Sequence, residues 1–81
     1  MAATTQIVWN YQQQFDQTIN TAAQAKVQQM ESEGKTTGMK DLEWLSNNTW
    51  QVTREWVSTE AAQEWIDFLL PYNPISANII N

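Results

Sequence analysis

The stretch TWQVTREWVSTEAAQEWIDFLL, residues 49–70, decides the fold because two different hydrophobic periods meet within it. From Thr49 to Val57, apolar and polar residues alternate with period two, which is typical of a half-buried β-strand. After Ser58 the spacing changes to that of one face of an α-helix, which contains Ala62, Trp65, Ile66 and Leu69. The stretch therefore predicts a strand followed directly by an amphipathic helix.

The predicted helix has a recognisable start and stop. Ser58 suits the N-cap because its hydroxyl can accept a hydrogen bond from the first turn, and Glu60 places a carboxylate where the helix dipole favours it. Pro71 ends the helix at Leu70, because a proline ring blocks continuation of the helix. We expect four polar residues to occupy the solvent face, namely Glu60, Gln63, Glu64 and Asp67.

The flanking segments repeat the same pattern. Beyond a turn at residues 72–74, alternation over residues 75–80 predicts a last strand, and alternation over Gln6–Tyr11 favours a first strand. Asp16 can cap a helix that ends before Gly34 and whose apolar stripe is Ile19, Ala22, Ala23, Val27 and Met30. A weaker strand over Leu42–Leu45 and a turn at residues 46–48 would form a hairpin with the strand that begins at Thr49.

The resulting order, β-α-β-β-α-β, predicts one α+β domain over residues 1–81, a ferredoxin-like sandwich of two helices on one antiparallel sheet. An alternative order, α-β-β-α-β, begins with a longer N-terminal helix. Its apolar stripe would be Val8, Tyr11, Phe15 and Ile19, and the intervening glutamines are good helix formers. The sequence leaves both orders open for residues 6–11.

The composition excludes several classes of function. The 81 residues contain no cysteine and no histidine, which removes thiol chemistry, the usual general base and the commonest zinc ligand. The chain has nine acidic and four basic side chains, so it lacks the clustered positive charge of a nucleic-acid-binding surface. No apolar run approaches the roughly 20 residues that span a bilayer. We therefore expect no catalytic, cofactor or metal site, and neither nucleic acid nor membrane as a partner.

Two motifs suggest chemistry but have simpler structural explanations. Gly34-Lys35-Thr36 looks like the tail of a phosphate-binding loop, but Gln29 stands where the first glycine belongs, and the motif follows a helix instead of a strand. We interpret it as a helix C-cap and a polar turn. Glu60, Glu64 and Asp67 are spaced like acid–base pairs, but such pairs need burial to separate their pKa values. We interpret them as a solvated helix face.

Arg54 carries the most information about function. It shares a strand face with Trp50, Val52 and Trp56, so its guanidinium must reach solvent, pair with a carboxylate or lie over an indole. One interpretation is an arginine at the edge of the sheet, stacked on a tryptophan. The other is a contact with an anion or with a partner at a subunit interface, which makes these four residues the candidate interface.

The chain also has five tryptophans, an unusual number for its length. Core packing accounts for Trp50, Trp56 and Trp65, which follow the predicted strand face and helix stripe. Trp9 and Trp44 are less constrained, and flat aromatic side chains can line a ligand pocket.

Four segments carry a resemblance to known proteins. They are GKTTG at residues 34–38, VTREW at 52–56, TEAAQEWIDF at 59–68 and YNPISA at 72–77. With these segments the chain resembles a type of short uncharacterised protein encoded by tailed bacteriophages, particularly marine ones. The resemblance implies a phage source but no activity. The first residues do not form a signal peptide, so we expect the protein in the host cytoplasm or the virion.

Three functions follow as hypotheses. The first is a non-catalytic phage accessory or protein-interaction module that forms a homodimer, because two helices cover only one face of the sheet. The second is a small ligand-binding protein or cofactor-independent enzyme, resembling dimeric ferredoxin-like monooxygenases. The third is an acidic inhibitor of a host protein. A flat apolar sheet face would favour the homodimeric interaction module. A pocket lined by Trp9 or Trp44 around a polar group would favour the ligand-binding protein or enzyme. A convex cluster of carboxylates would favour the acidic inhibitor.

Overall fold

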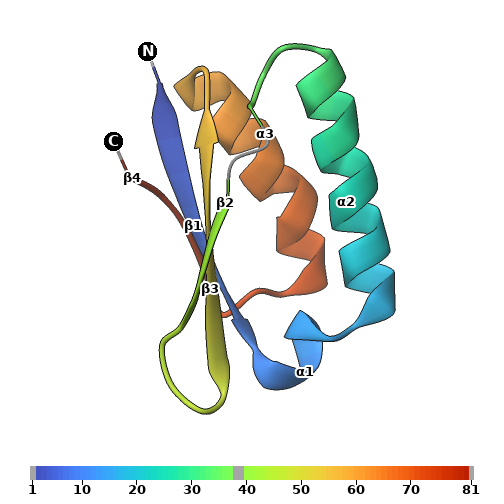
Figure 1. The fold of residues 1–81 in the computed structure, drawn as a ribbon, viewed down its shortest axis with the longest axis vertical. Coiled ribbons are helices and arrows are strands. Elements are labelled where there is room, and N and C mark those ends of the chain that lie inside the picture. The colour runs from blue at the N-terminus through green and yellow to red at the C-terminus, as the bar shows by residue number, and fades with distance from the viewer. Residues whose placement is uncertain (1, 38–39, 81) are drawn as a thin grey trace.

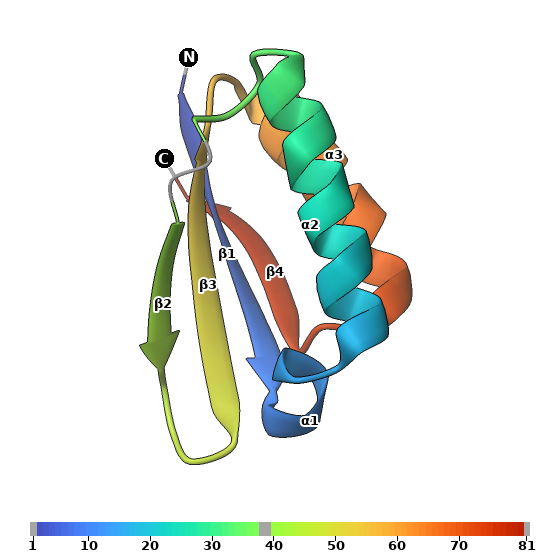
Figure 2. The ribbon, with the colours of Figure 1, turned by 45° about the vertical axis from the view of Figure 1, so that its right-hand side comes forward.

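The computed structural model describes residues 2–37 and 40–80 and contains a four-stranded antiparallel sheet with helices on one face (Figure 1). The elements in chain order are β1 (Ala3–Asn10), α1 (Tyr11–Gln14), α2 (Gln17–Ser32), β2 (Lys40–Trp44), β3 (Thr49–Trp56), α3 (Thr59–Leu69), the 3₁₀ turn η1 (Leu70–Tyr72) and β4 (Ser76–Ile80). The strand order is β2-β3-β1-β4. Figure 2 shows the sheet as one layer and α2 and α3 as the other. The predicted ferredoxin-like α+β fold is confirmed.

The first strand settles the ambiguity at the N-terminus. Ala3–Asn10 pair with β3 on one side and Thr4–Val8 pair with β4 on the other, so the alternative order with a long N-terminal helix is wrong. The strand begins three residues earlier than predicted. Only Tyr11–Gln14 forms a helical turn, which Asn10 and Gln13 close with a reciprocal capping box. Pairing outweighs the helix propensity of the glutamines, because the residues from Thr4 to Val8 find hydrogen-bonding strands on both sides.

The other predicted boundaries lie close to the observed ones. Asp16 caps α2 with its side chain, Gly34 follows that helix at φ +75°, and Ser58 caps α3. The second strand was predicted at Leu42–Leu45 and instead spans Lys40–Trp44. This strand lies at the edge of the sheet and all five of its residues are exposed. Its sequence therefore lacks the alternation of apolar and polar residues that predicts a half-buried strand.

The core lies between the sheet and the two helices. Its fully buried side chains include Ile7 of β1, Met30 of α2, Trp56 of β3 and Leu69 of α3. The opposite face of the sheet is mostly polar and carries Thr4, Gln6, Thr49, Gln51, Thr53 and Glu55 among others. An antiparallel sheet can face water on such a side. The flat apolar face that would have favoured a sheet-to-sheet dimer is therefore not present on these strands.

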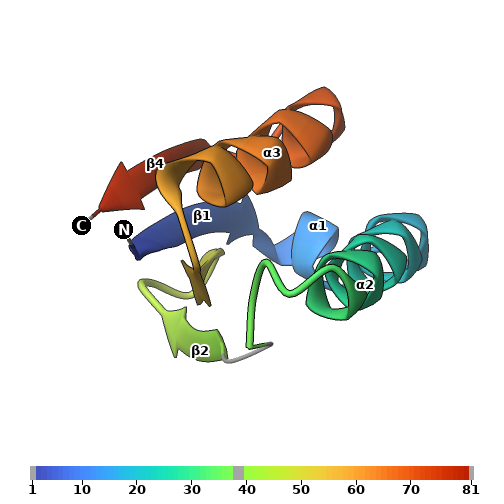
Figure 3. The ribbon, with the colours of Figure 1, turned by 90° about the horizontal axis from the view of Figure 1, so that it is seen from above.

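The two helices cover the sheet unequally. Viewed from above in Figure 3, α3 lies over β1 and β4, whereas α2 is displaced and does not lie over β2. Residues of α2, β2 and β3 line two adjoining cavities between these elements. We call the space formed by both cavities the α2–β2 groove.

Candidate functional site: a cationic groove and an aromatic cluster

The structure places the four predicted interface residues on the helix-covered face of the sheet. In the β1–β3 register, Trp50, Val52, Arg54 and Trp56 lie opposite Trp9, Ile7, Thr5 and Ala3, which are all buried under the helices. Trp56 is itself only 2% exposed. An interface through the open face of the sheet therefore cannot use these residues, and two of them, Val52 and Arg54, line the α2–β2 groove instead.

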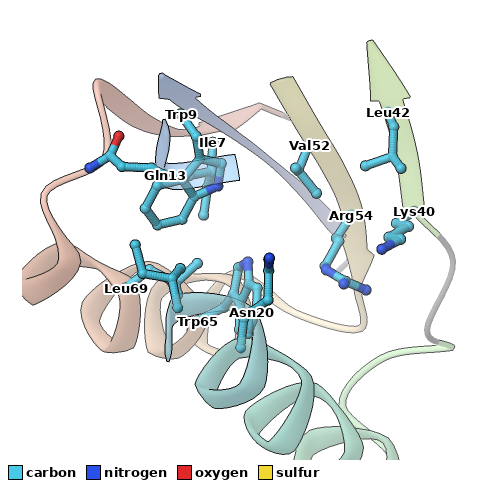
Figure 4. A pocket seen from close by; sticks show the side chains of 12 residues that line it. Ile7, Trp9, Gln13, Asn20, Lys40, Leu42, Val52, Arg54, Trp65 and Leu69 are labelled. Carbon is cyan, nitrogen blue, oxygen red and sulfur yellow. The ribbon is translucent and has the colours of Figure 1, made fainter. Parts of the chain in front are cut away.

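The α2–β2 groove has an inner apolar part and an outer polar part. The inner cavity, of about 80 Å³, is lined mainly by apolar side chains, among them Ile7, Trp9, Ile19, Leu42, Val52, Trp65 and Leu69 (Figure 4). The outer cavity, of about 430 Å³, runs along α2 past Gln24, Gln28 and Glu31. Lys40 and Arg54 line both cavities and so mark the place where the two meet. Trp9 thus contributes to a pocket that also holds charged groups.

Arg54 does not lie at the sheet edge, as one interpretation required, because β3 is flanked by β2 and β1. Its guanidinium carbon lies 5.4 Å from the centre of the Trp65 ring, so the predicted stacking on a tryptophan is present. Its Nε is buried and has no hydrogen-bond partner among the described residues. Burial lowers the pKa of Arg54, and the charge of Glu31 partly opposes this shift. The guanidinium nevertheless stays protonated.

Lys40 lies directly opposite Arg54 in the β2–β3 register, and the two side chains share the groove (Figure 4). Like charges in this position are destabilising. Partial desolvation of its ammonium group lowers the pKa of Lys40, and the charge of Arg54 lowers it further. Within residues 2–37 and 40–80, neither cation has a carboxylate within salt-bridge distance.

The other two cations of the chain have a structural role. Glu64 of α3 accepts hydrogen bonds from Lys26 Nζ at 2.9 Å and Lys35 Nζ at 2.7 Å, and Lys35 also pairs with Glu33 at 3.0 Å. Lys35, followed by Lys26, lowers the pKa of Glu64, and the same bond raises the pKa of Lys35. Glu64 is therefore not part of a freely solvated helix face. It joins α2 and the segment after it to α3.

The Gly34-Lys35-Thr36 motif is part of this structural link. Thr36 is buried, and its hydroxyl donates a 2.6 Å hydrogen bond to the carbonyl oxygen of Glu55 in β3. The backbone N–H of Val57 donates to the carbonyl oxygen of Lys35 at 2.9 Å. These bonds hold the connection against β3, which agrees with its interpretation as a cap and turn. Gly38, the last residue of the related segment, lies outside the described residues.

An aromatic cluster lies beside the groove, and sequence reasoning did not find it. The rings of Tyr11 and Phe15 are tilted against each other with 5.0 Å between their centres. Tyr11 lies 6.0 Å from Trp44, and Trp44 meets Trp50 edge-on at 4.4 Å. Three of these side chains are well exposed: Tyr11 by 52%, Phe15 by 61% and Trp44 by 45%. We call Tyr11, Phe15 and Trp44 the aromatic cluster. Tyr11 and Phe15 are four residues apart, but Trp44 comes from the distant β2, so no local pattern reveals the cluster of all three.

Within residues 2–37 and 40–80, no three histidine, cysteine, aspartate or glutamate side chains gather where they could hold a metal ion. None of the described helices has the length and the apolar character that crossing a membrane requires.

These features define a ferredoxin-like α+β domain with a partly open helical layer. The chain matches no family model and no curated protein sequence. Among solved structures it is similar to the C-terminal domain of the MgtC protein from Mycobacterium tuberculosis, with a TM-score of 0.65 and 9% sequence identity. The match covers 98% of this chain and 84% of that domain. At this identity the similarity establishes the shared fold and nothing further.

Proposed function

We propose that this chain is a non-catalytic protein-interaction module that forms a homodimer through its aromatic cluster. The observation that carries the proposal is the contact of Tyr11 with both Phe15 and Trp44, three aromatic side chains that are each at least 45% exposed. Contiguous exposed apolar patches are uncommon on monomers and mark interaction sites. Aromatic side chains are also enriched at the centres of interfaces.

A second copy of the chain is the occupant that the charges favour. The aromatic cluster carries no charge, so it can meet its own image across a two-fold axis without pairing like charges. Elsewhere, two copies of net charge −5 repel one another. Antiparallel pairing of two β2 edges centred on Leu42 would set Asp41 opposite Glu43 twice, and such like-charge pairs are destabilising. Contact through side chains is therefore preferred over continuation of the sheet.

The phage accessory role forms part of this proposal and rests on the sequence resemblance alone. An acidic inhibitor is less favoured, because two of the carboxylates, Glu33 and Glu64, are occupied by lysines of the same chain. The pocket around Trp9 and Arg54 favours a ligand-binding role in addition.

Sedimentation equilibrium of the Phe15→Ser variant tests the dimer. We expect the parent to sediment with twice the chain mass at tens of micromolar and the variant to sediment as a single chain. At a concentration low enough for both proteins to be monomeric, their thermal melts should be similar, because Phe15 is largely exposed. Leu70→Ser is the matched control, since Leu70 is 51% exposed and lies outside the aromatic cluster. A parent that stays monomeric on concentration would overturn the proposal.

A further inference from the structure

We propose that the α2–β2 groove binds a short aliphatic monocarboxylate, with its carboxylate between Arg54 and Lys40 and its tail in the inner cavity. This site is separate from the aromatic cluster and does not depend on dimer formation. The proposal rests on three observations: the unpaired donor of Arg54, the adjacent charge of Lys40 and the apolar lining next to both.

The first observation concerns hydrogen bonding. The Nε–H of Arg54 is buried without a partner among the described residues, although buried polar groups in folded proteins nearly always have one. A guanidinium can only donate, so the missing group must be an acceptor. A carboxylate matches the planar fork of an arginine and can accept two parallel hydrogen bonds from it.

The second observation concerns charge. Lys40 and Arg54 face each other across β2 and β3, and no carboxylate of the described chain lies within salt-bridge distance of either cation. A bound anion would relieve this repulsion. Glu31 lines the outer cavity together with both cations and supplies one negative charge there. The net positive charge is thus small, which favours a monoanion over a dianion such as phosphate.

The third observation concerns size and polarity. The inner cavity begins where the two cations lie and is lined beyond them by Ile7, Val52 and Leu69, among others. Its volume of about 80 Å³ is well below the ~150 Å³ of an engineered cavity that accepts benzene. A short aliphatic chain therefore fits better than an aromatic ring.

Nuclear magnetic resonance can observe the proposed contact directly through the Nε–Hε signal of Arg54. We expect saturable shifts of this signal on titration with acetate, propionate and butyrate, with affinity rising about fourfold for each added methylene. Benzoate, butylamine and inorganic phosphate should give no saturable shift. This titration uses the unmodified chain, so it does not depend on the folding of any variant.

Two lysine variants distinguish specific binding in the α2–β2 groove from non-specific attraction of anions to positive charge. Lys40→Gln should weaken butyrate binding by at least about tenfold, the loss expected for one charge-assisted hydrogen bond. Lys35→Gln removes the same charge at a distance from the groove and should leave the affinity unchanged. The proposal is wrong if carboxylates give no saturable shift, if phosphate binds as well as butyrate, or if both lysine variants lose affinity equally. Repeating the titration with the Phe15→Ser variant, which we expect to be monomeric, shows whether carboxylate binding is independent of dimer formation.

Discussion

The indole N–H of Trp56 donates a 2.9 Å hydrogen bond to the hydroxyl of Thr5, and both side chains are fully buried. Thr5 lies on β1 and Trp56 on the neighbouring β3, so the bond ties together the two central strands of the sheet. It also explains how a polar threonine occupies the helix-covered face. Without it, a buried indole N–H would lack an acceptor.

Thr5→Val should therefore destabilise the fold although it nearly preserves the side-chain volume. We expect a loss of about 1–3 kcal/mol in the free energy of unfolding, the cost of leaving a buried donor unpaired. Urea denaturation followed by tryptophan fluorescence measures this loss. Thr5→Ser keeps the hydroxyl and is the control, although it also removes a methyl group. If Thr5→Val were as stable as the parent, the hydrogen bond would contribute nothing.

Trp65→Ala should be the most damaging single truncation of α3. Trp65 is 3% exposed, its ring centre lies 5.3 Å from that of Trp56 in a tilted arrangement, and it lies beneath the guanidinium of Arg54. Removal of a buried aromatic side chain costs about 3–5 kcal/mol, which is a large share of the stability of so small a domain. Circular dichroism should show a chain that is largely unfolded at room temperature. Trp44→Ala, which truncates an exposed tryptophan, should melt much closer to the parent.

The Glu64 ion pairs should make stability depend on pH at both extremes. Because its lysine partners lower the pKa of Glu64, they stabilise the fold above about pH 4.3, the pKa of an unfolded glutamate, and this contribution is lost as pH falls through the folded value. The pKa of Lys35 is raised, so its contribution is present below about pH 10.4 and is lost as pH rises through its folded value.

Glu64→Gln tests this pH dependence. The variant should lose less stability than the parent between pH 5 and pH 3, as measured by melting temperature across a pH series. Glu43→Gln, at an exposed glutamate of β2, is the matched control. Parallel curves for the parent and Glu64→Gln would show that the lysine contacts do not persist in solution.

Stability should also be independent of metal ions. The prediction is motivated by the absence of histidine and cysteine from the sequence, and calcium bound through carboxylates is the remaining route. Thermal melts in EDTA, in calcium and in zinc should coincide. An increase of several degrees with either metal would reveal a site that the sequence did not indicate.

Local patterns accounted for much of the fold. The period-two strand before Ser58, the helical stripe after it, and the caps at Asp16 and Ser58 are all visible in the sequence, because strand alternation and helix capping depend on residues close together in the chain. The same is true of Gly34, whose positive φ follows from its place after α2. The composition alone likewise excludes chemistry that needs a cysteine thiol or a histidine, because the sequence contains neither residue.

Contacts between distant segments decided the rest. The sequence of residues 6–11 fits both a strand and a helix, and the pairing of β1 with β3 and β4 stabilises the strand. Lys40 and Arg54 became neighbours through the β2–β3 hairpin, and Tyr11 met Trp44 through the packing of α1 against that hairpin. Which face of β3 the helices cover, and how far α2 lies from β2, depend on the packing of the whole sheet. The groove and the aromatic cluster therefore exist only in the tertiary structure, because each combines side chains that no short stretch of sequence contains together.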